Sequence, residues 1–466
     1  MAAPQVSSGE HEQWSSRIGF LMAAVGSSVG LGNLWRFSAE AGQNGGGAFV
    51  LVYLLCVAFI GIPVLMSEYV IGRGSAKASA VQSVVDLADQ SGVSRQWSLM
   101  AWIGMIAAFM VVCFYSSVAG WVLAYIPKFL FGAFNGQDPK AIAAQFGTLI
   151  SDPMAVLPYF TAFVILTTWL VSRGVNRGIE WASTFLMPLF FILLAALAIY
   201  SLVSGFSTQV EIDGKTVNAG AYALTWLFQP DFAKINPSVV TSALGQAFFS
   251  IGIGSAIMIT YGSYLQHGVN IPKSAGIVAL ADTGVALIAG MAIFPIVFAH
   301  GLSPTAGAGL FFQTLPVALV SAPGGQYIGT AFFLLAIFAA VTSSISLLEV
   351  SVAWVIDKTK SSRFVASWGL GLLMWGVGLG TVYSQKFFGF LDKTTGTLML
   401  PISGLMVVLF VGWRLNKAVL AKELEGTSPV AIFLLMFLVR FVAPAAVAII
   451  LVSGIFERYL GITLFG

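Results

Sequence analysis

Charge is scarce in this chain: only 9% of its 466 residues are Asp, Glu, Lys or Arg, whereas soluble domains carry about 25%. The formal net charge is +3 and there is no basic run, so no nucleic-acid partner is expected. Hydrophobic residues make up 58% of the chain, and the mean hydropathy is +0.90. A surface this poor in charge must face membrane lipid over most of its area.

Cysteine and histidine are nearly absent, with two and three residues respectively. Cys56 and Cys113 fall inside long apolar runs, where we expect small core residues and neither a disulfide nor a metal pair. His11, His267 and His300 are scattered without ligand spacing. A membrane enzyme needs a metal cluster or a nucleophile with its base, and the sequence offers neither. We therefore predict that the chain is not an enzyme.

Long apolar runs dominate the sequence. Runs of roughly 20 residues, the length of a membrane helix, occur about eleven times. We predict spans at 17–38, 48–71, 98–127, 156–172, 178–204, 238–266, 274–299, 327–356, 364–384, 394–413 and 429–455. The first run has no small-residue cleavage site and leads into further spans, so a removable signal peptide is not expected. The predicted fold is an all-α integral membrane protein. Lys and Arg are more frequent in the loops that would be cytoplasmic if the N-terminus is inside, and we predict that orientation.

Two of these runs are interrupted by glycine. Residues 26–33 (GSSVGLGN) break the first run, and residues 252–256 (GIGSA) break the sixth. Each glycine weakens a helix by about 1 kcal/mol relative to alanine. In lipid, a broken backbone is tolerated only where its polar groups face a cavity, water or an ion. Paired breaks predict a secondary transporter with its site near the membrane midplane.

The breaks also suggest how the chain is divided. Each broken helix would be the first in a set of five helices, which predicts an inverted 5+5 repeat with helices 1 and 6 broken. The predicted parts are a cytoplasmic tail (1–14), a first repeat (15–204), an extracellular connection (205–237), a second repeat (238–413), and a loop, helix 11 and C-terminus (414–466).

Ionisable residues inside predicted spans are candidates for function, because each costs about 2.5–3.5 kcal/mol there. They are Arg36, Glu68, Asp282, Glu349 and Arg440. Arg36 could instead reach interfacial water along its stem, and Glu68 lies near a span end where water could solvate it. For Arg440 we favour a structural pairing.

Hydroxyl groups cluster near the breaks. Ser250 precedes the second break, and Thr342-Ser343-Ser344 lies inside an apolar run. A single such hydroxyl often bonds to its own helix. Beside unwound backbone, several of them supply neutral oxygens suited to a hard, weakly charged cation.

At these residues the chain resembles the neurotransmitter:sodium symporter family, and most closely its bacterial eleven-span amino-acid transporters with the leucine-transporter fold. The specific motifs are residues 30–37 (GLGNLWRF), 44–49 (NGGGAF), 245–250 (GQAFFS) and 342–344 (TSS). The resemblance implies a sodium-coupled amino-acid symporter that works by alternating access. It also implies a location in the bacterial inner (plasma) membrane.

The resemblance implies a set of site residues as well. Sodium site 1 would use the Ser28 carbonyl with Asn33, Ser250 and Asp282. Sodium site 2 would use the carbonyls of Gly26, Val29 and Ala339 with the hydroxyls of Thr342 and Ser343. The substrate site would comprise Ser27, Ser28, Gly30, Gly32, Val111, Tyr115, Phe249, Ser250, Gly252, Ser255, Ser343 and Leu347. Tyr115 would bind the substrate carboxylate, and Phe249 would close over it.

The gates follow from the same resemblance. The outer gate would be Arg36 and Asp392, with Gln246 beside them. The inner gate would be Trp14, Tyr264, Glu349 and Asp357, and Glu68 would link the two breaks. His11 stands where the family has an inner-gate arginine, so Arg17 could substitute for it, or closure could depend on pH.

Other departures bear on the substrate. Gly30 stands where monoamine transporters have an aspartate, so the substrate should bring its own carboxylate and be an amino acid. Asp282 stands where many members have asparagine, and its charge predicts that chloride is not required. Small residues at Gly252 and Ser255, with Val111 and Leu347 as walls, favour a bulky hydrophobic or aromatic side chain. The same small residues could instead serve close helix packing. A small or non-proteinogenic amino acid, or a non-transporting amino-acid sensor, are the alternatives.

Overall fold

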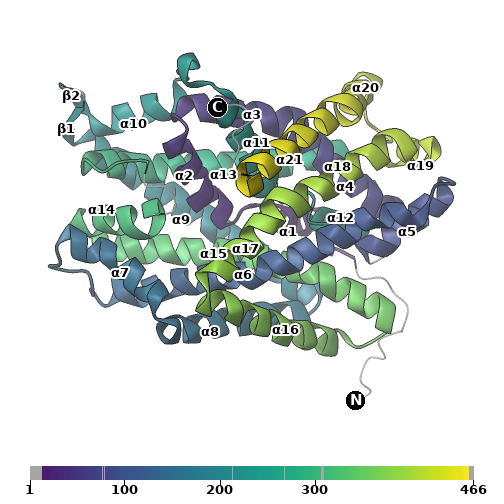
Figure 1. The fold of residues 1–466 in the computed structure, drawn as a ribbon, viewed down its shortest axis with the longest axis horizontal. Helices are drawn as coiled ribbons and strands as arrows, with labels where there is room; N and C mark the ends of the chain where they lie inside the picture. Colours follow the sequence, from purple (N-terminus) through teal and green to yellow (C-terminus); the bar gives the residue numbers. More distant parts are fainter. Residues whose placement is uncertain are drawn as a thin grey trace.

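The computed structural model describes residues 13–75, 77, 79–212, 214–266, 268–305 and 309–460 of the chain. His11 and His267 lie outside the described residues, and so does most of the predicted N-terminal tail. In Figure 1 the long helices lie side by side along the longest axis, with the β1–β2 hairpin at one end and α5 at the other. We call these ends the outer and inner sides, following the predicted orientation.

Within the described residues, nine helices are long and apolar enough to cross a membrane, some of them with an internal π-helical turn. Five have no π-helical turn: α6 (Leu99–Leu130), α8 (Pro153–Ser172), α13 (Ile271–Ala299), α15 (Gly325–Thr359) and α16 (Arg363–Tyr383). Two of the others are α3 (Gly47–Cys56), which continues through Val57–Gly61 into α4 (Ile62–Ser75), and α9 (Trp181–Phe206), which follows Val175–Glu180. The last two are α17 (Gln385–Thr394), which continues through Thr395–Met399 into α18 (Leu400–Leu409) and Phe410–Arg414, and α20 (Pro429–Phe437), which continues through Leu438–Val442 into α21 (Ala443–Leu460).

The first predicted span is a bent pair of helices. α1 (Arg17–Ser28) begins after Ser16, whose hydroxyl accepts the N–H of Gly19, and it ends where Val29 is extended. The chain resumes as a π-helical turn (Gly32–Arg36) and α2 (Phe37–Gln43), at 48° to α1. The predicted break therefore lies where the glycines are.

The sixth predicted span is also two helices. α11 (Pro237–Ile251) ends at Gly252, whose φ is +73°, and α12 (Ile257–Ser263) begins after Ala256. Gly254 has φ +83°, and a Cβ there would lie 2.2 Å from the Leu400 carbonyl oxygen. Only glycine fits this position, because both the left-handed backbone and the close approach exclude a side chain. Ten of the eleven predicted spans thus correspond to the nine long helices and the bent pair α1–α2. The remaining predicted span, 238–266, is the broken element formed by α11 and α12.

Short elements connect the spans. They are α5 (Ala80–Gln90), a 3₁₀ turn (Arg95–Ser98), α7 (Pro139–Ser151), β1 (Gln209–Ile212), β2 (Lys215–Asn218), α10 (Ala219–Phe228), a 3₁₀ turn (Phe232–Lys234), a π-helical turn (Leu310–Thr314), α14 (Leu315–Ser321) and α19 (Lys417–Glu423). The two strands pair antiparallel, with Gln209 opposite Asn218 and Ile212 opposite Lys215. The predicted helical membrane fold is confirmed, with this hairpin as a small addition.

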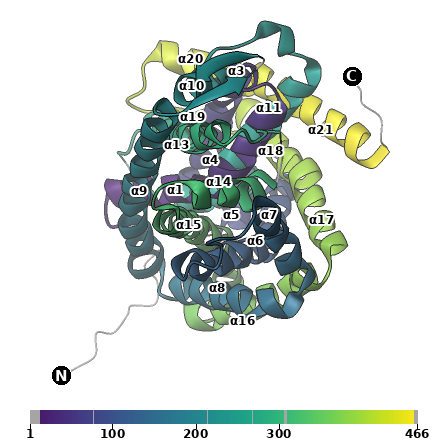
Figure 2. The same cartoon turned by 90° about the vertical axis from the view of Figure 1, so that its left-hand side faces the viewer.

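The end-on view shows which helices lie inside. In Figure 2, α1, α4 and α15 lie inside the molecule, while α8, α9, α16 and α17 lie around it. α15 is buried along almost its whole length, including Thr342, Ser343 and Glu349. The elements that carry the predicted site are therefore those shielded from lipid.

Candidate functional site

At Gly30 the first break packs against α6 and α15 so closely that a side chain is excluded. A Cβ on Gly30 would lie 2.6 Å from the Ser343 Oγ and 3.2 Å from the Tyr115 hydroxyl. The backbone N–H of Leu31 donates to that hydroxyl at 3.2 Å. An aspartate at this position would not fit without moving Ser343. The Leu31 N–H and the Tyr115 phenol therefore lie together at the first break, and both are groups that can donate to a carboxylate.

A central cavity of about 60 Å³ lies between the two breaks. Its walls include all twelve residues predicted for the substrate site, namely Ser27, Ser28, Gly30, Gly32, Val111, Tyr115, Phe249, Ser250, Gly252, Ser255, Ser343 and Leu347. Two further residues, Ile257 and Leu400, also line it and were not predicted. Both are apolar residues in apolar runs, so no sequence signal distinguishes them from core leucines and isoleucines.

The residues predicted for sodium site 1 form a connected polar cluster. Asn33 Nδ2 donates to Asp282 Oδ1 at 2.7 Å, to the Asp282 carbonyl at 3.0 Å and to Ser250 Oγ at 3.0 Å. Ser250 Oγ donates to Asp282 Oδ2 at 2.8 Å. The Ser28 hydroxyl, as distinct from the carbonyl predicted as a ligand, donates at 3.1 Å to the carbonyl of Ile251, the residue after Ser250. Asp282 is fully buried, so its carboxylate accepts from the neutral amide of Asn33 and the neutral hydroxyl of Ser250 inside the protein.

The residues predicted for sodium site 2 also lie together. Ser343 Oγ contacts the carbonyl oxygens of Gly26 at 3.4 Å and Val29 at 3.3 Å, across from α15 to the first break. Thr342 Oγ1 contacts the Ala339 carbonyl at 3.1 Å. Three carbonyls and two hydroxyls converge here without a carboxylate, which is a donor set suited to a singly charged hard cation.

On the outer side, two larger cavities adjoin the central one. A cavity of about 230 Å³ is lined by Arg36, Asp392, Tyr115 and Phe249 among others, and a cavity of about 300 Å³ is lined by Arg36, Phe249 and Leu400 among others. Arg36 and Asp392 therefore face one cavity, as the predicted outer gate requires.

The polar partners of the outer gate lie on both broken elements. The Nε of Arg36 lies 3.9 Å from a Glu40 carboxylate oxygen. The other Glu40 oxygen accepts from the Ser242 hydroxyl, which lies on α11. Gln246 is fully buried and donates to the Gly32 carbonyl at 3.1 Å. These contacts join α2 and the first break to α11.

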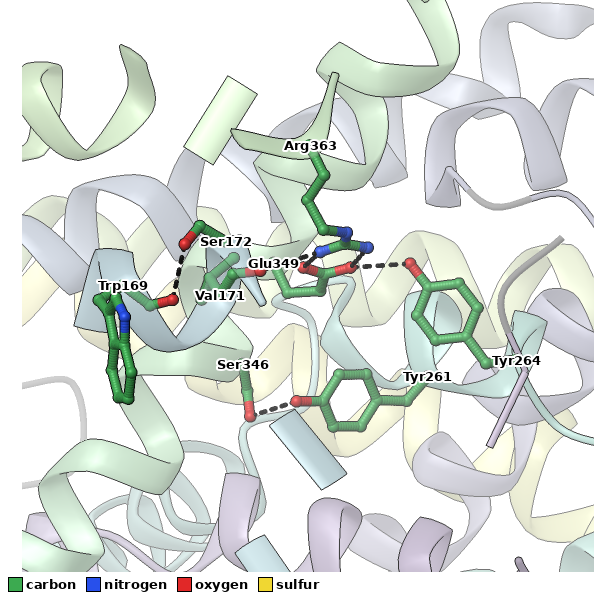
Figure 3. A network of polar contacts seen from close by, with 8 residues as sticks. All are labelled: Trp169, Val171, Ser172, Tyr261, Tyr264, Ser346, Glu349 and Arg363. Carbon is green, nitrogen blue, oxygen red and sulfur yellow. Dashed lines mark hydrogen bonds and ion pairs between the residues drawn. The ribbon is translucent and has the colours of Figure 1, made fainter. Parts of the chain in front are cut away.

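The inner side is closed by aromatic and charged contacts. Trp14 is buried, its indole N–H donates to the Tyr261 carbonyl at 3.1 Å, and its backbone N–H donates to the Tyr264 carbonyl at 3.3 Å. Figure 3 shows Glu349 between Arg363 and Tyr264. The two Nη atoms of Arg363 donate to the Glu349 carboxylate at 2.7 and 3.0 Å, and the Tyr264 hydroxyl donates to it at 3.0 Å. Glu349 is fully buried, so its charge is balanced inside the protein.

Two charged residues on this inner side have partners that were not predicted. Arg363, at the start of α16, is the ion-pair partner of Glu349. Asp357, predicted for the inner gate, is partly exposed and pairs with Lys360 at 3.4 Å, one helical turn away. Within the described residues, Arg17 forms no ion pair with Asp357. His11, the other residue considered for the inner gate, lies outside the described residues.

Two other intramembrane charges have structural partners. Glu68 accepts from the Gly254 N–H at 2.7 Å, so it binds the second break directly; its other oxygen is buried without a partner among the described residues. Its predicted contact with the first break is not seen in that part of the chain. Arg440 donates to the Gly412 carbonyl at 2.8 Å, which supports the structural pairing we favoured.

A further acidic residue was not predicted at all. Glu180, at the start of α9, is buried and accepts from the backbone N–H of Ser15 at 2.9 Å and its hydroxyl at 2.5 Å. A Cβ on Gly19 would lie 1.7 Å from the Glu180 carboxylate. A carboxylate thus occupies the N-terminus of α1, where exposed N–H groups favour negative charge. An acid at the first turn of a predicted span was the available signal.

Comparisons with known proteins agree with this geometry. The chain matches the model of the "Sodium:neurotransmitter symporter family" over residues 11–137 and 150–460. The "Uncharacterized sodium-dependent transporter YhdH" of Bacillus subtilis is 35% identical over 95% of this chain and 97% of its own. An "Uncharacterized sodium-dependent transporter" of Haemophilus influenzae is 32% identical over 96% and 99%. The crystal structure of MhsT in complex with L-phenylalanine is similar with a TM-score of 0.85 and 38% identity, covering 96% of this chain and 100% of MhsT.

Proposed function

The chain belongs to the sodium:neurotransmitter symporter family, and on that basis we propose that it imports bulky hydrophobic or aromatic L-amino acids with sodium. It is a multi-pass sodium-dependent transporter and not an enzyme. The observation that carries the proposal is the central cavity, whose lining combines the hydroxyl groups of Tyr115 and Ser343 with the apolar side chains of Val111 and Leu347. The similar structure of MhsT holds L-phenylalanine, which supports an aromatic substrate here.

The substrate would be bound from both ends. Its carboxylate would accept from the Leu31 N–H and the Tyr115 hydroxyl, which lie 3.2 Å apart in the structure. Its side chain would extend towards Gly252, Val111 and Leu347. A Cβ at Gly252 would meet nothing within 4 Å, so space is available at that end. Each buried methylene would stabilise binding by about 0.8 kcal/mol.

Two sodium ions would bind with the substrate. The first would take the place of hydrogen bonds in the Asn33–Ser250–Asp282 cluster and would contact the substrate carboxylate. The second would bind at Ser343, Thr342 and the carbonyls of the first break. Because Asp282 supplies a fixed negative charge beside the first ion, we propose that chloride is not required.

Alternating access would use the contacts on the two sides. With the inner side closed by Trp14 and the Glu349–Arg363 pair, substrate would enter through the outer cavities and Phe249 would close over it. Loss of the second sodium ion would free the first break from Ser343 and let α1 move. Each unit charge crossing 100 mV contributes about 2.3 kcal/mol, so two sodium ions with a zwitterion would support more than a thousandfold accumulation.

Thermal stabilisation of the purified protein tests this function. The twenty amino acids would be compared in sodium and then in potassium, with the full chain in detergent. We expect a few bulky hydrophobic or aromatic amino acids to raise the melting temperature, and only in sodium. Stabilisation by small amino acids alone would favour the alternative substrate class. If no amino acid stabilises the protein in either salt, the proposal is wrong.

Binding alone would not separate a transporter from an amino-acid sensor. Reconstituted vesicles with an inward sodium gradient make this distinction. We expect uptake of the stabilising amino acid above its external concentration, and collapse of uptake when the gradient is dissipated. Sodium-dependent binding without uptake would favour the sensor.

A further inference from the structure

Leu400, the first residue of α18, forms part of the wall between two cavities. Of the residues that line the central cavity, only Leu400 and Phe249 also line the 300 Å³ outer cavity. Leu400 is buried, so its side chain lies between these spaces and not on a lipid-facing surface. Phe249 is the predicted lid, but no role has been given to α18 in the substrate site.

The position of Leu400 is fixed by close backbone packing. Its carbonyl lies 2.2 Å from where a Cβ on Gly254 would be, and a Cβ on Gly404 would lie 2.7 Å from the Phe248 ring. Ser403 donates to the Met100 carbonyl at 3.0 Å, which anchors α18 to α6. Small residues allow such close approach between membrane helices. α18 is therefore held directly against the second break.

Leu400 lies at the apolar end of the central cavity. The carboxylate-binding end is formed by Gly30, Tyr115 and Ser343, which crowd one another at the first break. Leu400 instead packs on Gly254, beside Gly252, where a Cβ would meet open space. A substrate whose carboxylate binds at the first break would therefore extend its side chain towards Leu400.

We propose that Leu400 is a specificity-determining residue that limits the length of the substrate side chain. The inference rests on the proposed amino-acid substrate and deepens it. A substrate side chain that is too long for the central cavity meets Leu400. Beyond Leu400 lies the much larger outer cavity. Shortening Leu400 joins the two spaces and admits longer side chains, whereas enlarging it shortens the cavity.

A series of amino acids with unbranched side chains of increasing length measures this limit. Isothermal titration in sodium would use L-alanine, L-2-aminobutyrate, L-norvaline, L-norleucine and L-2-aminoheptanoate with the full chain. In the wild type, the Kd should fall about fourfold for each added methylene until the cavity is full, and then rise. Leu400→Ala should move this turning point to a side chain longer by one or two methylenes. The Kd for L-alanine should change less than threefold.

Two further variants make the result decisive. Leu400→Phe should move the turning point to a shorter side chain, and it decides the question if Leu400→Ala does not fold. Leu405→Ala is the matched control, because Leu405 is a half-buried leucine on the same helix that lines none of the three cavities. An unchanged turning point in both Leu400 variants would overturn the inference while leaving the transporter intact. Absence of any binding by the wild type would overturn the proposed function, and this inference with it.

Discussion

The guanidinium carbon of Arg36 lies 4.5 Å from the centroid of the Phe249 ring. Phe249 lines the central cavity and both outer cavities, so the cation rests on the ring that separates them. A cation on an aromatic face is stabilised by about 0.5–2 kcal/mol, depending on its exposure to water. The predicted lid and the predicted outer gate are thus in direct contact, and one cannot move without disturbing the other.

Weakening this contact should speed escape of the substrate. We expect Arg36→Gln to raise the dissociation rate of bound amino acid by about 2- to 30-fold, the range that corresponds to loss of the cation–ring contact. Arg36→Lys keeps the charge but loses the planar guanidinium group, so its dissociation rate should lie between those of the wild type and Arg36→Gln. The measurement is the release of radiolabelled substrate after dilution. Gln43→Ala, at an exposed residue lining the same outer cavities, should leave the rate unchanged. Equal rates for Arg36→Gln and the wild type would contradict this role.

Two adjacent serines on α15 differ in their contacts, and only one of them is a predicted sodium ligand. Ser343 faces the carbonyls of Gly26 and Val29, whereas Ser344 contacts Val341 and Thr167. We expect Ser343→Ala to raise the sodium concentration for half-maximal substrate binding by about tenfold, equivalent to about 1.4 kcal/mol. Ser344→Ala should change it by less than twofold. The measurement is a sodium titration of substrate binding at constant ionic strength, and equal shifts in both variants would exclude a specific role for Ser343.

The breaks could be predicted from sequence because glycines mark them. Glycine at Gly252 and Gly254 permits positive φ, which is a property of the residue itself. The close contact that excludes a side chain at Gly30 involves Ser343 on a distant helix, and it could not be predicted from the sequence. The resemblance then supplied the twelve cavity residues, which composition and periodicity alone could not have selected.

Partners contributed by distant segments were the part that sequence could not predict. The pairing of Glu349 with Arg363 depends on how α16 returns beside α15, and that of Glu180 with Ser15 on how α9 meets α1. Leu400 carries no polar signal at all.

The proposed independence of chloride rests on the buried charge of Asp282. Asp282→Asn removes the buried negative charge while keeping a side chain that can accept from Asn33. We expect transport by the variant to fall at least tenfold without chloride and to recover partly when chloride replaces gluconate. The wild type should be indifferent to that exchange. A variant that stays active and chloride-independent would show that the charge of Asp282 does not replace an anion.

Removing one partner of the inner ion pair should destabilise the protein strongly, whereas replacing both partners by uncharged residues should destabilise it little. Arg363→Met leaves the fully buried Glu349 without its counterion, and breaking such a pair typically costs about 3–5 kcal/mol. The double variant Glu349→Gln with Arg363→Met removes both charges and should recover most of the lost stability. The measurement is the melting temperature of the purified protein in sodium. A double variant no more stable than Arg363→Met would show that packing, and not charge balance, sets this cost.

Glu180 and Gly19 should act as one unit that holds α1 in place. Glu180→Gln weakens the contacts with Ser15, and Gly19→Ala should displace the same carboxylate, because the new methyl group would lie 1.7 Å from it. Each change should favour opening of the inner side by about 10- to 150-fold, since a hydrogen bond to a charged group contributes about 1.5–3 kcal/mol. The readout is the rate of thiol labelling at Ser346→Cys, a buried inner-side position, in a chain whose two native cysteines are buried. Glu425→Gln, at an exposed acid on the same side, is the control. Because both changes act on one contact, the double variant should label no faster than either single variant. Additive acceleration would mean that the two residues act independently.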